Sequence, residues 1–384
     1  RELLITMRGR MLHDVSGQLG FQPYGKNEGE VIYSISRGGL NELLLNTAEH
    51  QYGVKFHFER RVMAADLDSG GVRIREEDSK RQFLIEQTPV IAADGAGSIV
   101  RRQMSKLPGY SAREDYLSHA YKELNIPAAE EGGHRIDANA LHIWPRGDYM
   151  LIALPNLDGS FTVTLFLPRD GQLSFESLAS EPAVLQFFES QFPDALELIP
   201  DLAEQFFTNP TGAMVTVYCQ PWRVGGKFLL IGDAAHAVVP FHGQGMNCAF
   251  EDCNELDECI SDKGAPGSRG WERVFAEFEQ RRKPNADAIA AMALENYIEM
   301  RDTVRNPRFQ LKKELAWELE RRFPDTFVPR YSLVMFHHVP YAEAQRRGII
   351  QQQILEELLG DNDTLDHVNY EQADRLITEQ LPFL

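Results

Sequence analysis

The stretch KFLLIGDAAHAVVPFHGQGMNCAFED, residues Lys227–Asp252, decides how the whole chain is interpreted. Its apolar start, Phe228–Ile231, is typical of a short buried strand, and Gly232-Asp233 ends that strand. An amphipathic run begins near Gln244, after a loop that contains a proline and glycine. A carboxylate and the free N–H groups of a helix N-terminus then lie side by side, which suits the sugar and phosphate groups of a ligand. From residue types alone, an ordinary strand–turn–helix crossover is an equally good interpretation.

Composition restricts the class of protein. The 384 residues include 39 basic and 57 acidic residues, for a net charge of −18, which argues against a nucleic-acid-binding protein. The four cysteines form no CxxC pair and no disulfide framework, so we expect a reducing, cytoplasmic location and no metal site. No apolar window reaches the roughly 18 residues of a membrane span, and we expect no membrane anchor in these residues.

The exact residues of the opening stretch are more specific than their pattern. GDAAH followed by GQGMN and ED closely resembles the second FAD-binding motif of single-component flavoprotein aromatic hydroxylases. VIAADGAGSIVRR, residues 90–102, resembles the DG motif of the same hydroxylases, which is implicated there in binding both FAD and NADPH. The resemblance implies a Rossmann-like FAD-binding domain, with the nicotinamide of NADPH visiting the surface near Asp94 and Arg101.

Hydrophobic periodicity predicts a mixed α/β fold with interleaved domains. The expected domains are residues 1–106 (first part of the FAD-binding domain), 107–220 (an antiparallel-sheet substrate domain), 221–303 (second part of the FAD-binding domain) and 304–384 (C-terminal helices). Predicted strands cover residues 7–13, 31–36, 54–59, 62–67, 72–74, 88–93, 141–144, 149–154, 161–167 and 228–231. Predicted helical segments cover residues 37–50, 175–206 (broken at Pro182, Pro193 and Pro200), 270–302, 308–322, 342–359 and 370–380.

A narrower resemblance extends over nearly the whole chain. The strings MRGRMLH, QPYG, YKEL, ALHIWPRGDYMLIALPN, PFHGQGMNCAFED, AMALENYIEM and FVPRYSLVMF together resemble the kynurenine 3-monooxygenase family. That resemblance implies a FAD enzyme of tryptophan catabolism that uses NADPH and O2 to convert L-kynurenine to 3-hydroxykynurenine through a C4a-hydroperoxyflavin. The reaction needs no metal and no side-chain nucleophile, so no residue is assigned as catalytic.

The resemblance also implies a set of substrate-binding residues. They are Arg10 of MRGR, Tyr24 of QPYG, Asn296 of ENY and Tyr331 of PRYS. An arginine can bind the α-carboxylate of kynurenine through two parallel hydrogen bonds, and the tyrosines and the amide add further polar contacts. Without the resemblance, a surface ion pair for Arg10 and helix-surface polarity or core packing for the others are the better interpretations.

The implied FAD-binding residues come from several segments. They are Arg37, Val62 (through its backbone), Asp233 (facing the ribityl chain), Met246 and Asn247 (beside the isoalloxazine ring). Phe241 and His242 are expected to line the substrate side of that ring. His242 is not assigned as a general base, because the ortho-amino group of kynurenine already activates its ring.

One departure from the family concerns the first FAD motif. GxGxxG and its following acidic residue do not occur in this sequence. Either about 70 residues, two βα units at ~30 residues for each βαβ unit, are missing ahead of Arg1, or the protein is truncated and does not hold FAD. We expect the first. A hydroxylase of another anthranilate-like or phenolic acid, and a cofactor-free binding protein, stay open as alternatives, and a homodimer is compatible with the sequence.

Overall fold

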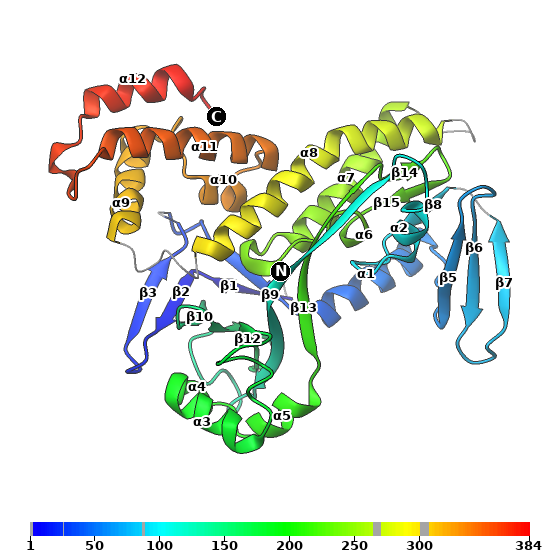
Figure 1. Ribbon diagram of the computed structural model, residues 1–384, viewed down its shortest axis with the longest axis horizontal. Coiled ribbons are helices and arrows are strands. Elements are labelled where there is room, and N and C mark those ends of the chain that lie inside the picture. Colours follow the sequence, from blue (N-terminus) through cyan, green and yellow to red (C-terminus); the bar gives the residue numbers. More distant parts are fainter. Residues whose placement is uncertain (1–2, 26, 87–88, 264–269, 300–306) are drawn as a thin grey trace. The chain divides into compact units, whose positions relative to one another are not determined.

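The structure is a computed structural model that describes residues 3–25, 27–86, 89–263, 270–299 and 307–384 (Figure 1). The chain forms two compact units. The first comprises Arg1–Phe56 and Leu117–Met214, and the second comprises His57–Tyr116 and Val215–Leu384. Residues 1–56 therefore group with the sheet segment, although the sequence-based domains join them to the FAD-binding part. The division of the chain into FAD-binding and substrate domains at the sequence-based boundaries stays a prediction.

The first unit is built on a seven-stranded sheet with the order β13-β9-β12-β11-β10-β2-β3. Neighbouring strands from β9 to β10 and the pair β2–β3 are antiparallel, whereas β10 and β2 are parallel. The mostly antiparallel sheet is thus confirmed. The strands are β2 (Gly9–His13), β3 (Leu19–Pro23), β9 (Ser111–Ile126), β10 (Ala140–Pro145), β11 (Met150–Pro155), β12 (Phe161–Pro168) and β13 (Thr211–Gln220).

Three short helices supply the aromatic side of the first unit's core. They are α3 (Glu181–Gln191), α4 (Pro193–Leu196) and α5 (Leu202–Thr208), and their buried phenylalanines pack with Trp144 and the apolar residues of β11 and β12. The prediction of a helical segment broken at Pro193 and Pro200 is confirmed for residues 181–206, but residues 175–180 are not helical and Pro182 causes no break. That proline lies in the first turn of α3, where a missing N–H costs nothing, so it starts a helix rather than breaking one.

Two other expectations near the N-terminus are wrong. The predicted strand 7–13 is two strands, β1 (Leu4–Met7) and β2, because the chain turns at Arg8 and β1 pairs instead with β4 (Ile32–Ile35). Residues 54–58 pair with no strand among the described residues, since a left-handed Gly53 and a positive φ of 54° at Glu59 interrupt the extended run.

The helix predicted at 37–50 is α1 (Arg37–Tyr52), and Ser36 caps it by accepting a hydrogen bond from the N–H of Gly39 at 3.2 Å. This is the side-chain cap that a serine at such a position provides. The apolar stripe predicted for α1 is present in the sequence but not buried. Leu43, for example, is 49% exposed.

The second unit contains the two nucleotide motifs on neighbouring parallel strands. Its three-stranded sheet has the order β14-β15-β8, with β14 (Arg223–Val224), β15 (Phe228–Leu230) and β8 (Val90–Ala92). Leu230 lies opposite Ala92 in the parallel pair, so the DG and GD motifs leave the sheet at the same edge. A separate meander consists of β5 (Arg60–Asp66), β6 (Gly71–Glu76) and β7 (Gln82–Glu86). Its first two strands correspond to the predicted strands 62–67 and 72–74.

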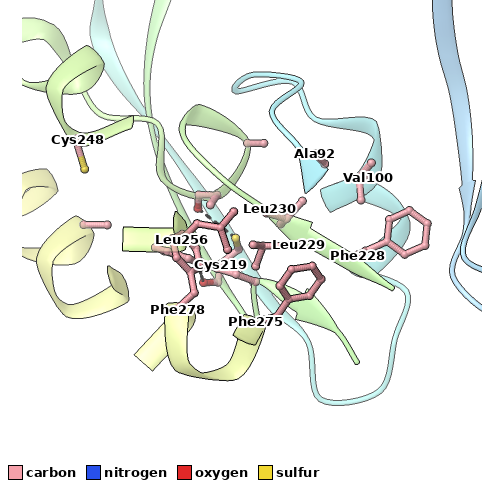
Figure 2. Close-up of a cluster of buried hydrophobic side chains, with 14 of the residues drawn as sticks. Ala92, Val100, Cys219, Phe228, Leu229, Leu230, Cys248, Leu256, Phe275 and Phe278 are labelled. Carbon is pink, nitrogen blue, oxygen red and sulfur yellow. Dashed lines mark hydrogen bonds between the residues drawn. The ribbon is translucent and has the colours of Figure 1, made fainter. Parts of the chain in front are cut away.

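Helices bury this small sheet from both sides. Figure 2 shows Val100, from α2 (Ile99–Met104), and Phe275, from α8 (Trp271–Ile298), on opposite sides of β15. The three residues of β15 are fully buried, which accounts for their uninterrupted apolar character. Helix α7 (Gly245–Lys263) lies alongside α8 in Figure 1, and both correspond to predicted helices.

The C-terminal helices have a core of their own. This core is formed mainly by leucines and isoleucines of α9 (Pro307–Arg322), α11 (Tyr341–Leu359) and α12 (Tyr370–Gln380), all three of which were predicted. The short helix α10 (Arg330–Phe336) was not. In the parts of the chain that the structure describes, no helix has the length and apolar character needed to cross a bilayer.

Candidate functional site

The turn after β15 presents one carboxylate next to a buried strand. Gly232 has φ +56°, a conformation that any side chain would strain, so a glycine is required there. The next residue, Asp233, begins the short helix α6 (Asp233–His236) and is exposed, although Ala234, Ala235 and His236 are buried. The local fold therefore places this carboxylate at the surface, where a hydroxyl-bearing ligand can reach it.

The start of α7 forms the second part of the site. Gln244 is buried; its side-chain oxygen accepts hydrogen bonds from the Tyr341 hydroxyl at 2.9 Å and from the Asn247 amide at 3.1 Å. Met246 is 45% exposed and Asn247 is also exposed, whereas Cys248 behind them is fully buried. The first N–H groups of a helix have no acceptor within it. This turn thus offers backbone donors together with one apolar and one amide side chain.

These observations test whether the residues fit FAD. A ribityl chain needs hydrogen-bond acceptors, and the exposed Asp233 supplies them. A flat ring needs close approach of backbone and an apolar surface, and Gly243, with φ +67° and no atom within 4 Å of its ideal Cβ position, leaves that space open beside Met246. The residues of this turn and helix start fit the flavin half of FAD.

The DG motif is connected to this turn by Arg101. Asp94 accepts a hydrogen bond from the N–H of Ile99 at 2.8 Å and so holds the start of α2. The Arg101 guanidinium donates to the carbonyl of Ala234 at 2.8 Å, to Glu114 at 2.7 Å and to the carbonyl of Ala96. Because Arg101 is 2% exposed, the expectation that it meets NADPH at the surface is wrong. Asp94 is exposed and stays a candidate.

Two of the predicted substrate residues meet around the 3-10 turn η1 (Pro240–His242) in the second unit. The Asn296 amide donates to the carbonyl of Phe241 at 2.6 Å. The ring of Tyr331 stacks on that of His242, with centroids 5.7 Å apart and an interplanar angle of 23°. Phe241 packs in turn against Tyr297, at 4.6 Å between centroids. The three segments that carry Asn296, Tyr331 and η1 therefore form one local cluster.

The other two predicted substrate residues lie together in the first unit. The Arg10 guanidinium lies over the Tyr24 ring, 5.6 Å from its centroid. Arg10 is on β2, between Leu141 of β10 and Gln22 of β3, and the N–H of Tyr24 donates to the carbonyl of Arg8 at 3.1 Å. The adjacent strands thus fix both side chains at one place on the sheet.

The remaining predicted cofactor residues occupy two further elements. Arg37 is the first residue of α1, in the first unit, and is exposed. Val62 lies on β5, in the second unit, where the pairing with β6 shifts register between Val62 and Ala64. A bulge of this kind frees backbone groups from the ladder, which is compatible with a backbone contact at Val62.

A buried charge network behind the GD turn was missed by the sequence reasoning. Asp252, with 0% exposure, accepts hydrogen bonds from His236 Nε2 at 2.6 Å, from the N–H of Gly232 at 2.8 Å and from Arg282 Nε at 2.8 Å. Burial lowers the pKa of His236, but the hydrogen bonds to Asp252 and Cys248 and the negative charge of Asp252 together outweigh it and raise that pKa to about 10. Asp252 is the last residue of the ED pair that follows GQGMN. Because acidic residues are common on helices, the sequence alone did not indicate that this one is buried.

Within the described residues, one group of three side chains has metal-binding geometry, namely His236, Cys248 and Asp252. Its ligand atoms already have other partners. Arg282 donates to Cys248 Sγ at 3.3 Å as well as to Asp252, and His236 carries a proton at neutral pH because its pKa is raised. These two buried cations oppose a metal cation at this place, and the absence of a metal site stays a prediction.

Comparisons with known proteins agree on one family. The family model described as FAD binding domain matches residues 24–292. The chain is 47% identical over 381 residues to kynurenine 3-monooxygenase of Myxococcus xanthus, covering 99% of this chain and 81% of that protein. It is 45% identical over 388 residues to kynurenine 3-monooxygenase of Dictyostelium discoideum, covering 99% and 83%.

Solved structures share the fold at lower identity. The tetrameric form of 2-methyl-3-hydroxypyridine-5-carboxylic acid oxygenase superposes with a TM-score of 0.61 at 20% identity, covering 80% of this chain and 77% of that one. Klebsiella pneumoniae HpxO complexed with FAD and uric acid gives a TM-score of 0.60 at 19% identity, covering 83% and 78%. At these identities the likeness supports the mixed α/β fold alone.

Proposed function

Because the chain belongs to the kynurenine 3-monooxygenase family, we propose that it hydroxylates L-kynurenine to 3-hydroxykynurenine, with FAD as cofactor and NADPH and O2 as co-substrates. The observation that carries this proposal is the identity of 44–47% over nearly the whole chain to relatives of that name. The exposed Asp233 and Met246, which lie just after the buried strand β15 and at the start of α7, support it from the structure.

The overall reaction balances without any group from a side chain. L-Kynurenine, NADPH, O2 and one proton give 3-hydroxykynurenine, NADP+ and water, so one oxygen atom enters the ring and the other leaves as water. When bound, FAD supplies the redox chemistry between NADPH and O2. The chain's own part is to bind, orient and exclude water, and the amino group of kynurenine activates the ring carbon beside it.

For FAD, we assign the ribityl hydroxyls to Asp233 and the ring to the first turn of α7. Asp233 accepts from hydroxyls as a carboxylate on a rigid turn. Met246 provides apolar surface, and Asn247 is fixed by its hydrogen bond to Gln244. Arg37 and Val62 are proposed to contact the remainder of the cofactor, Arg37 through its guanidinium and Val62 through its backbone.

For kynurenine, we assign the α-carboxylate to Arg10. A planar guanidinium matches a carboxylate in a bidentate way, and the Tyr24 ring beneath Arg10 limits where the guanidinium can turn. Asn296 and Tyr331 are proposed to bind other polar groups of kynurenine. Their contacts with Phe241 and His242 hold them at η1.

We further infer a cytoplasmic location. The four cysteines are free, three of them buried and Cys253 exposed, and free thiols persist in a reducing compartment. A homodimer is compatible with all of these assignments.

The proposal is tested by NADPH consumption in purified full-length protein supplied with FAD. We expect L-kynurenine to accelerate NADPH oxidation and to yield a hydroxylated product in nearly equal amount. Simple phenolic acids serve as the matched comparison. Hydroxylation of a phenolic acid in preference to kynurenine would assign the chain to another aromatic hydroxylase, and a colourless protein that oxidises no NADPH would contradict the proposal altogether.

A further inference from the structure

Asp252 collects hydrogen bonds from three different segments of the second unit. Its Oδ2 accepts from the N–H of Gly232, at 2.8 Å, and from His236, at 2.6 Å, so it touches both ends of the segment that contains Asp233. Its Oδ1 accepts from Arg282 on α8, at 2.8 Å. Asp252 itself lies on α7, about one and a half turns beyond Met246 and Asn247. One buried carboxylate therefore links the GD turn to α7 and α8.

Arg282 extends this link to the first turn of α7. Its Nη2 donates to the carbonyl of Cys248 at 3.1 Å, and its Nη1 donates to Glu251 at 2.9 Å. Cys248 directly follows Asn247 in the chain. The guanidinium thus holds the backbone next to the predicted ring-contacting pair, while Asp252 holds the backbone next to Asp233.

We propose that Asp252, His236 and Arg282 form a clamp that sets the spacing between the Gly232-Asp233 turn and the first turn of α7, and thereby the affinity for FAD. The clamp rests on the proposed placement of FAD at these two segments. Its three residues touch neither the ring nor the ribityl chain. They are positioning residues, which act through the backbone of Gly232 and Cys248.

The charge balance explains why the clamp needs all three members. Two cations, Arg282 and protonated His236, share the carboxylate of Asp252, and the partly exposed Glu251 supplies the second negative charge. Replacing Asp252 by an amide removes the carboxylate that keeps His236 protonated, and it leaves the buried guanidinium of Arg282 without this charged partner. Buried charges without partners are strongly unfavourable, so we expect His236 or Arg282 to turn away and the GD turn to relax.

The test compares Asp252→Asn on α7 with a matched variant on the neighbouring helix α8, Glu279→Gln. Glu279 accepts hydrogen bonds from the N–H of Trp222 at 2.7 Å and pairs with Arg223, so its replacement also removes a partly buried charge from α8. FAD release from the holoenzyme is followed by recovery of flavin fluorescence. The unfolding midpoint of each protein stripped of FAD is measured alongside.

We expect Asp252→Asn to weaken FAD binding by about 10–100-fold, the size of loss that removing an outer-shell partner causes at metal sites, and to broaden the absorption bands of the flavin that remains bound. Glu279→Gln is expected to lower the unfolding midpoint but to keep FAD affinity within about twofold. Arg282→Lys, which keeps the charge but cannot reach Asp252 and Cys248 together, should fall between them, and it serves as the test if Asp252→Asn does not fold.

Two results would overturn the inference in different ways. If Asp252→Asn and Arg282→Lys lower the unfolding midpoint as Glu279→Gln does, and all three release FAD at the wild-type rate, the network stabilises the fold and positions nothing. If wild-type protein binds no FAD, the proposed function fails first and the clamp fails with it.

Discussion

At the scale of single residues, Arg10 carries the proposed recognition of the substrate carboxylate. Arg10→Ala should weaken L-kynurenine binding by about 2–4 kcal/mol, as breaking one partner of a close charge pair does. The sharper test uses kynurenamine, the analogue without the α-carboxylate. Wild-type protein should bind it much more weakly than kynurenine, and Arg10→Ala should bind the two alike, as measured by titration of the holoenzyme.

Arg135→Ala is the matched control for Arg10. Arg135 lies in the same unit, between β9 and β10, and donates a hydrogen bond to the carbonyl of Ala128 at 3.3 Å. This variant should discriminate between the two ligands as wild type does. If Arg10→Ala also keeps that discrimination, the carboxylate is bound by another residue.

Some residues of the candidate site could be predicted from the sequence, and others could not. Asp233, Met246 and Asn247 could be named because they lie within one continuous motif, and the structure places them on one turn and one helix start. The partners of Asp252 could not be named, since His236 and Arg282 are 16 and 30 residues away from it. Arg101 was misjudged for a related reason, because a charged residue on a short helix gives no sign that carbonyls enclose it.

At the scale of elements, a pair of histidines fastens β2, the strand that carries Arg10. His13 on β2 contacts His142 on β10 at 2.8 Å and Asp194 on α4 at 2.6 Å. His142 also contacts the carbonyl of Asp137 at 2.8 Å. Trp144 stacks on His13, at 4.0 Å between ring centroids, and donates to Asp194. The register of β2 is thus held at its end by side chains as well as by the ladder.

This cluster predicts a loss of stability at mildly acidic pH. Burial lowers the pKa of His142 to about 4, from an ordinary value of 6.5. Between these pH values, His142 binds a proton in the unfolded chain but not in the folded chain. The free energy of unfolding should therefore fall as pH drops from about 6.5 to 4, by up to ~3 kcal/mol. Burial opposes ionisation of Asp194, but the hydrogen bonds from His13 and Trp144 and the other polar contacts together outweigh it and lower the pKa of Asp194, so its effect comes at lower pH.

Denaturant unfolding of His142→Gln across this pH range tests the expectation. The variant should be less dependent on pH between 4 and 6.5 than wild type. His50→Gln is the control, because His50 is exposed on α1 in the same unit, and it should retain the wild-type dependence. Equal pH dependence in His142→Gln and wild type would show that His142 titrates normally in the folded protein.

Elements with a strong hydrophobic periodicity were predicted well. Elements that depend on pairing between strands were predicted poorly. The strands β10, β11 and β12 and the helices α8, α9, α11 and α12 follow their predicted ranges closely. The long strands β9 and β13 were missed, since their polar and apolar residues alternate irregularly. Residues 54–59 alternate well, yet the backbone at Gly53 and Glu59 prevents them from joining a sheet.

At the scale of the whole molecule, the predicted substrate and cofactor residues divide between the two compact units. Arg10, Tyr24 and Arg37 belong to the first, and Val62, Asp233, Met246, Asn247, Asn296 and Tyr331 belong to the second. The interleaving was predictable from the order of the motifs along the chain. The grouping of residues 1–56 with the sheet was not, because it depends on the parallel pairing of β2 with β10, between segments about 130 residues apart.

The most direct test of the proposed activity follows the oxygen atom. Purified holoenzyme is given L-kynurenine and NADPH under isotopically labelled O2, and the product is analysed by mass spectrometry. We expect 3-hydroxykynurenine with one labelled oxygen on the ring carbon beside the amino group, and NADPH consumed in equal amount. Unlabelled product, a hydroxyl at another position, or consumption of NADPH with kynurenine unchanged would contradict it.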